Sequence, residues 1–114
     1  MLAQANRVIR PDEFRAVVRR GRRSSTASAV YHRLERSGTE PLRFGFIASR
    51  AIGNAVQRNT WRRRLRAVGR ELVDAGSTGA DVVVRGRPGC ADLSYRELRA
   101  ELLTALGQSS RIPS

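Results

Sequence analysis

The sequence predicts an α+β fold in which helices pack on one mixed β-sheet. Runs with helical spacing of apolar residues alternate with short β-branched runs, in the order helix, two or three strands, long helix, strand, helix. The chain has 114 residues, of which 40% are hydrophobic, and this suits one packed domain. We therefore expect a single domain over residues 1–107 and a flexible C-terminal tail over residues 108–114.

The first helix is predicted between Pro11 and Gly21. Proline favours the first helical position, and the two acidic residues that follow it lie at the positive end of the helix dipole. Apolar residues at i, i+3 and i+4 give this helix one face to bury. Glycine is a common residue at a helix end.

Two strands are predicted next, over Ala29–Leu34 and Leu42–Ala48, because residues 37–41 between them have the composition of a turn. A β-branched run predicts another strand at residues 81–84. The segment from the second strand through the long helix to this last strand could form a crossover unit.

The long helix is predicted over Ala55–Asp74, because Asn54 and Gln57 form the pattern of a capping box at its start. A second capping box, from Ser94 and Glu97, opens a final helix with leucines at i, i+4 and i+8. The stripe of the long helix that we expect to face the sheet consists of Trp61, Leu65, Val68 and Leu72.

The charge of the chain indicates a polyanionic partner. It has 22 basic residues, all of them arginine, and 10 acidic residues, which gives a formal net charge of +12. A surplus of this size is typical of proteins that bind nucleic acid or an anionic membrane surface. No apolar run approaches the length of a membrane span and no signal peptide is present, so we expect a cytoplasmic protein with no membrane partner.

The long helix also carries an arginine face. Residues 50–70 contain seven arginines and no acidic residue. Simple solvation of an outward face is one explanation, yet like charges four residues apart repel one another, so contact with phosphates is the favoured explanation. Membrane binding is disfavoured because the apolar stripe is needed for the core. The face consists of Arg58, Arg62, Arg66 and Arg70, with Asn59 and Arg63 beside them.

Residues 49–66, with the sequence SRAIGNAVQRNTWRRRLR, resemble the signature of the bacterial ribonuclease P protein family. The resemblance extends over nearly the whole chain. It implies a single-domain α-β-β-β-α-β-α sandwich on a mixed four-stranded sheet, similar to ribosomal protein domain 2, with a left-handed βαβ crossover.

The resemblance also implies a function. The holoenzyme is an endoribonuclease that removes the 5′ leader from precursor tRNA, and its catalytic subunit is an RNA that uses Mg²⁺. The protein would bind the catalytic RNA and precursor tRNA, would need no small-molecule cofactor, and would be inactive alone. With one histidine and one cysteine, the chain itself offers no zinc site and no obvious nuclease centre.

Two RNA-binding surfaces follow from the resemblance and from the arginine face. The surface for the catalytic RNA would consist of Arg50, Asn54, Arg58, Asn59, Arg62, Arg63, Arg66 and Arg70. The cleft for the single-stranded leader, between the first helix and the sheet, would consist of Phe14, Arg15, Val18, Tyr31 and His32.

The chain departs from the family pattern at several of these positions. Val18 stands where many members have an aromatic residue, and Thr60 replaces an arginine. A position that often carries tyrosine falls at His32, although Tyr31 is close enough to leave the register open. Trp61 replaces an aliphatic residue, and its place in the apolar stripe favours the core over base stacking. A structural ribosomal-type RNA-binding protein is the alternative function.

Overall fold

The computed structural model of this protein describes residues 2–106, and the tail predicted over residues 108–114 lies outside them. The order of elements confirms the predicted α+β fold. The helices are α1 (Pro11–Arg20), α2 (Ala55–Asp74) and α3 (Tyr95–Ala105), with short 3₁₀ turns at Gln4–Asn6, Arg50–Ile52 and Cys90–Asp92. The strands are β1 (Arg22–Ser25), β2 (Ala29–Glu35), β3 (Arg43–Ile47) and β4 (Ala80–Gly86).

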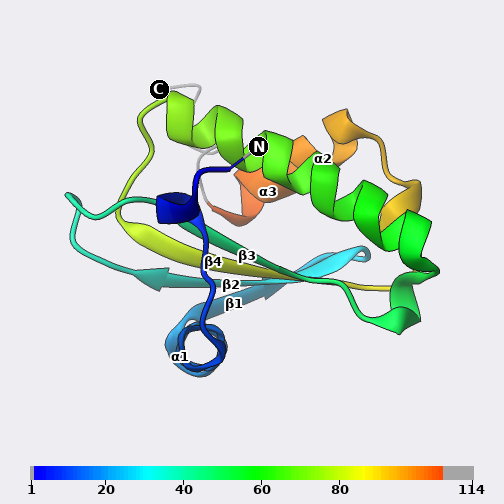
Figure 1. Cartoon of the computed structure of the whole chain (residues 1–114), viewed down its shortest axis with the longest axis horizontal. Coiled ribbons are helices and arrows are strands. Elements are labelled where there is room, and N and C mark those ends of the chain that lie inside the picture. Colours follow the sequence, from blue (N-terminus) through cyan, green and yellow to red (C-terminus); the bar gives the residue numbers. More distant parts are fainter. Residues whose placement is uncertain (1, 107–114) are drawn as a thin grey trace.

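The four strands form one mixed sheet in the order β1-β2-β4-β3. β2 pairs antiparallel with both β1 and β4, whereas β3 pairs parallel with β4. Because α2 connects the parallel pair, the predicted crossover unit is present, and its left-handed sense stays a prediction. α2 and α3 lie on one face of the sheet and α1 lies on the other (Figure 1).

The main core lies between the sheet and the helices α2 and α3. All four apolar residues of the predicted stripe on α2 are buried there, and Trp61 is 0% exposed. Its ring meets Phe46 edge-on at a centroid distance of 6.4 Å. Trp61 is therefore a core residue, as its place in the stripe predicted.

Among the described residues, α1 is the helix that packs on the opposite face of the sheet (Figure 1). Phe14 packs directly over Gly45 of β3, where a Cβ atom would lie 2.4 Å from Phe14 Cε1. A glycine at this position lets the helix approach the sheet closely, because any side chain would push Phe14 away. No helix among residues 2–106 is long and apolar enough to span a membrane.

Candidate nucleic-acid interface

The arginine face of α2 is set by the way the helix begins. The predicted capping box is present: Gln57 N donates to Asn54 Oδ1 at 2.9 Å, and Asn54 N donates to Gln57 Oε1 at 2.8 Å. This cap satisfies two backbone donors and fixes the residue at which the helix begins. The side-chain oxygen of Asn54 is committed to the cap, so this predicted contact residue also positions the helix.

The arginines on this face differ in how freely they can meet a ligand. Arg63 and Arg66 are exposed and Arg58 is half-buried. Arg62 is half-buried, and its Nη1 donates to Asn59 Oδ1 at 3.3 Å, which keeps two predicted contact residues side by side. Arg50 is exposed in the 3₁₀ turn that precedes the helix.

Arg70 is the member of the predicted set that faces a carboxylate on its own helix. Its Nε lies 3.1 Å from Asp74 Oδ2, one helical turn further on. Although residues 50–70 contain no acidic residue, Asp74 beyond them opposes the face at this position. Both side chains are more than half exposed, so the pair is weak and screened by salt.

Arg64, which the prediction left out of the face, has a structural role. Its Nη1 donates to the carbonyl oxygens of Ala91 and Leu93 at 3.1 and 2.7 Å. These bonds fasten α2 to the segment that leads into α3. The arginines of the run at residues 62–64 thus differ in role, since only Arg62 and Arg63 belong to the predicted contact face.

Arg7 joins the arginine face although the prediction did not include it. The N-terminal segment runs beside the outer edge of β3, with Val8 N donating to Phe44 O at 2.8 Å. Arg7 and Arg66 line a hollow of about 240 Å³ at this edge. Burial lowers the pKa of the Arg66 guanidinium, and the nearby positive charges of Arg7 and Arg62 lower it further. Sequence spacing along α2 could not reveal a contact with residue 7.

The surface formed by α1 and the side of the sheet that it covers is called the α1 face. Only one of the two candidate residues of β2 lies on it. His32 lies on the side of the sheet that α1 covers, in register with Arg23 of β1 and Val83 of β4. Tyr31 points to the other side, is buried in the main core and donates from its hydroxyl to Glu101 Oε1 at 3.1 Å. The inclusion of Tyr31 in the cleft is therefore wrong, because neighbouring residues of a strand face opposite ways.

His32 is a buried imidazole between cations. It is 6% exposed, and its Nδ1 has no hydrogen-bond partner among the described residues. Burial lowers the pKa of His32, and the positive charges of Arg23 and Arg85 lower it further. The ring is therefore neutral near pH 7. Both arginines were absent from the prediction, because only the strand register brings them beside His32.

The remaining predicted cleft residues lie on α1. Phe14 is half-buried against Gly45, and Arg15 is exposed. Val18 is 42% exposed, a large fraction for an apolar side chain. The α1 face thus combines an aromatic ring, a neutral imidazole and several cations, which is the chemistry that grips single-stranded RNA.

An ion-pair network holds α1 in place over the sheet. Arg43 of β3 donates to both oxygens of Asp81, from Nε at 2.8 Å and from Nη2 at 2.7 Å. Its Nη1 reaches Glu13 of α1 at 3.0 Å. Backbone hydrogen bonding at Arg10 lowers the pKa of Glu13, and Arg43 lowers it further. One guanidinium therefore couples the helix to two strands.

The described part of the chain holds no cluster of side chains suited to a metal ion. No three His, Cys, Asp or Glu side chains there come together where they could hold a metal ion. Cys90 is 0% exposed, and burial raises the pKa of its thiol to about 11, so this thiol is unreactive.

Comparisons with known proteins agree on one family. The family model described as Ribonuclease P matches residues 2–110. A ribonuclease P protein component from Clavibacter michiganensis subsp. michiganensis is 41% identical over 111 residues, covering 97% of this chain and 98% of that one. Another from Beutenbergia cavernae is 42% identical over 115 residues, covering 98% and 97%.

Solved structures show the same fold. The RNase P protein of Staphylococcus aureus superposes with a TM-score of 0.78 at 21% identity, covering 93% of this chain and 96% of that one. The RNase P protein of Thermotoga maritima superposes with a TM-score of 0.74 at 23% identity, covering 88% and 94%. At these sequence identities, the superpositions show only that the fold is shared.

Proposed function

This chain belongs to the bacterial ribonuclease P protein family, and from that premise we propose that α2 binds the catalytic RNA while the α1 face binds the 5′ leader of precursor tRNA. Family membership makes it the protein subunit of an endoribonuclease ribonucleoprotein that matures tRNA 5′ ends. The arginine face of α2 is the observation that carries the RNA contact, because its arginines project from a helix whose other side is buried.

The physical basis of the proposed RNA contact is charge. Each arginine that meets a phosphate releases counterions from the RNA, so affinity falls as salt rises. The chain brings a net charge of +12 to the complex, which would also reduce repulsion between RNA segments as they fold. Residues 2–106 do not fit a protein-held metal site, so we propose that the RNA subunit holds the Mg²⁺ ions that the family requires.

Replacing Arg58 and Arg62 together by alanine is expected to weaken binding of a bacterial ribonuclease P RNA by about tenfold. The basis is the loss of two phosphate contacts. Each contact contributes roughly 0.7–0.9 to the slope of log K against log salt concentration. The test is cleavage of precursor tRNA at low Mg²⁺ by that RNA, with and without the protein. We expect correct cleavage only with both partners, and a lower rate with the double variant.

The matched control for this experiment is Arg96→Ala, which removes one exposed arginine from α3. We expect it to support cleavage like the unchanged chain. If the RNA gains nothing from the protein across several bacterial ribonuclease P RNAs, the holoenzyme assignment fails. The structural ribosomal-type function would then take its place.

Val18→Phe is expected to tighten binding of precursor tRNA by the holoenzyme. Val18 is partly exposed on α1, one turn after Phe14, so a ring there would add a stacking platform without disturbing the core. One stacked base contributes about 1–3 kcal/mol, and we expect a gain near the lower end, roughly fivefold. The measurement is the affinity for precursor tRNA relative to mature tRNA, which lacks the leader.

Val56→Phe is the control, because Val56 is 73% exposed on α2 and places the same ring away from the α1 face. If Val18→Phe tightens binding of mature tRNA by the same factor, or if Val56→Phe tightens binding of precursor tRNA equally, the ring acts through nonspecific hydrophobic contact. The α1 face would then not hold the leader.

A further inference from the structure

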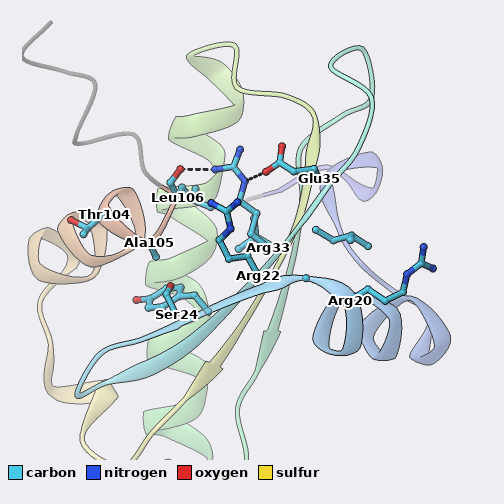
Figure 2. A pocket seen from close by; sticks show the side chains of 12 residues that line it. Arg20, Arg22, Ser24, Arg33, Glu35, Thr104, Ala105 and Leu106 are labelled. Carbon is cyan, nitrogen blue, oxygen red and sulfur yellow. Dashed lines mark hydrogen bonds and ion pairs between the residues drawn. The ribbon is translucent and has the colours of Figure 1, made fainter.

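A second basic groove lies on the side of the sheet that α3 covers, opposite the α1 face and separate from the arginines of α2. It lies along β1 and β2, between the end of α3 and the turn at Gly21 that follows α1 (Figure 2). Its volume is about 750 Å³. Arg20, Arg22 and Arg33 line it together with the hydroxyl-bearing Ser24.

Two of these arginines are placed against each other by the sheet itself. Arg22 of β1 and Arg33 of β2 are directly opposite in the antiparallel register, so their side chains leave the same face. Figure 2 shows them side by side next to the end of α3. Like charges in directly opposed positions destabilise a strand pair, and Arg20, the last residue of α1, adds a third cation to the wall.

Arg33 already has partners within the protein. Its Nη1 donates to the carbonyl oxygen of Leu106 at the end of α3, and its Nε lies 2.6 Å from Glu35 Oε2. Arg20 and Arg22 differ, because no ion pair found within residues 2–106 involves either of them. Glu35 is the one acidic residue among the lining residues. The groove therefore keeps a positive excess that a ligand could neutralise.

We infer that this groove binds the phosphate backbone of RNA through Arg20 and Arg22, as a third RNA contact beside α2 and the α1 face. The planar guanidinium fork matches phosphate oxygens and can bind them with two hydrogen bonds. The exposed hydroxyl of Ser24, two residues further along β1 than Arg22, is a further donor. The inference rests on the proposed function, which brings RNA to this chain.

Arg22→Gln tests the inference, with Arg96→Gln as the matched loss of one exposed arginine from α3. The readout is the dissociation constant for a bacterial ribonuclease P RNA across a salt series. We expect the salt slope of log K to fall by about 0.7–0.9 for Arg22→Gln and to stay unchanged for Arg96→Gln. The free Arg22→Gln protein should melt no lower than the unchanged chain, because the substitution relieves the repulsion from Arg33. Equal slopes for the two variants would overturn the inference.

A cross-link decides whether the contact is direct. A thiol-directed photo-cross-linker can be placed on Ser24→Cys, because the native thiol of Cys90 is buried and its pKa is raised to about 11. We expect cross-links to the RNA that disappear when Arg22→Gln is added, and none from Ala100→Cys, an exposed position on α3. Cross-links from Ser24→Cys to residues 107–114 of this chain in place of RNA would overturn the inference.

The Arg58→Ala, Arg62→Ala variant separates this inference from the proposed function. If RNA binding depends on Arg58 and Arg62 but not on Arg22, the groove assignment fails and the α2 contact stands. If binding is unaffected by any of these changes, the proposed function fails as well.

Discussion

Trp61→Ala is expected to lower the free energy of unfolding by about 3–5 kcal/mol, the usual range for a fully buried tryptophan. The indole is 0% exposed and lies between α2 and the sheet. Its Cζ2 is 3.1 Å from the position that a Cβ atom would take on Gly86 of β4, so the ring is tightly packed against this strand. A typical domain has only about 5–15 kcal/mol in total, so this variant would be at the edge of unfolding.

The measurement is a urea titration followed by far-ultraviolet circular dichroism, since Trp61 is the single tryptophan of the chain and its fluorescence is lost in the variant. Trp61→Phe is the control. We expect it to cost less than about 1.5 kcal/mol, because the indole Nε1 has no hydrogen-bond partner among the described residues and losing it removes a buried, unsatisfied donor. A small loss from Trp61→Ala would mean that this ring is not a core anchor.

Asp81→Asn is expected to lower the free energy of unfolding by about 3 kcal/mol. Asp81 is 4% exposed and accepts from two arginines, with Arg36 Nη1 at 3.1 Å and the two bonds from Arg43. An amide there keeps the shape but removes the negative charge between two guanidinium groups. Breaking a buried pair costs about 3–5 kcal/mol, and we expect the lower end because the arginines are 19% and 26% exposed.

Asp74→Asn is the matched control, because it removes the same charge from an exposed pair with Arg70. We expect a change below about 0.5 kcal/mol, measured in the same urea titration. Asp81→Asn should also weaken leader binding beyond its effect on stability, since Arg43 links Asp81 to Glu13 on α1. Equal losses from the two asparagine variants would contradict a special role for the network.

The elements with clear end signals were predictable from the sequence. The predicted bounds of α2 agree with the structure at both ends, and the capping pair Asn54 and Gln57 marks its start. Strand β1 was different: its four residues are all exposed and show no apolar alternation, so the residue pattern left two or three strands open before α2 and the family resemblance implied three. Local pattern predicts an element only where one side of it is buried.

The cleft was harder to predict because side-chain direction in a strand depends on register. A shift of one residue reverses every side chain of a strand, and Tyr31 and His32 were equally plausible in composition. The same limit hid Arg23, Arg85 and the opposed pair in the second groove. Each of these contacts joins residues from different strands, and their pairing is fixed by the whole sheet rather than by neighbours along the chain.

The place of β4 in the sheet has a consequence for co-translational folding. β4 lies between β2 and β3, yet it follows both of them in the chain. The β1–β2 pair and β3 therefore emerge without the strand that joins them, and the buried stripe of α2 emerges before its sheet is complete. Closure must wait until residue 86 has left the exit tunnel, and long-range pairing of this kind slows folding. During that interval the arginines of α2 lie beside an apolar stripe that the completed sheet will cover.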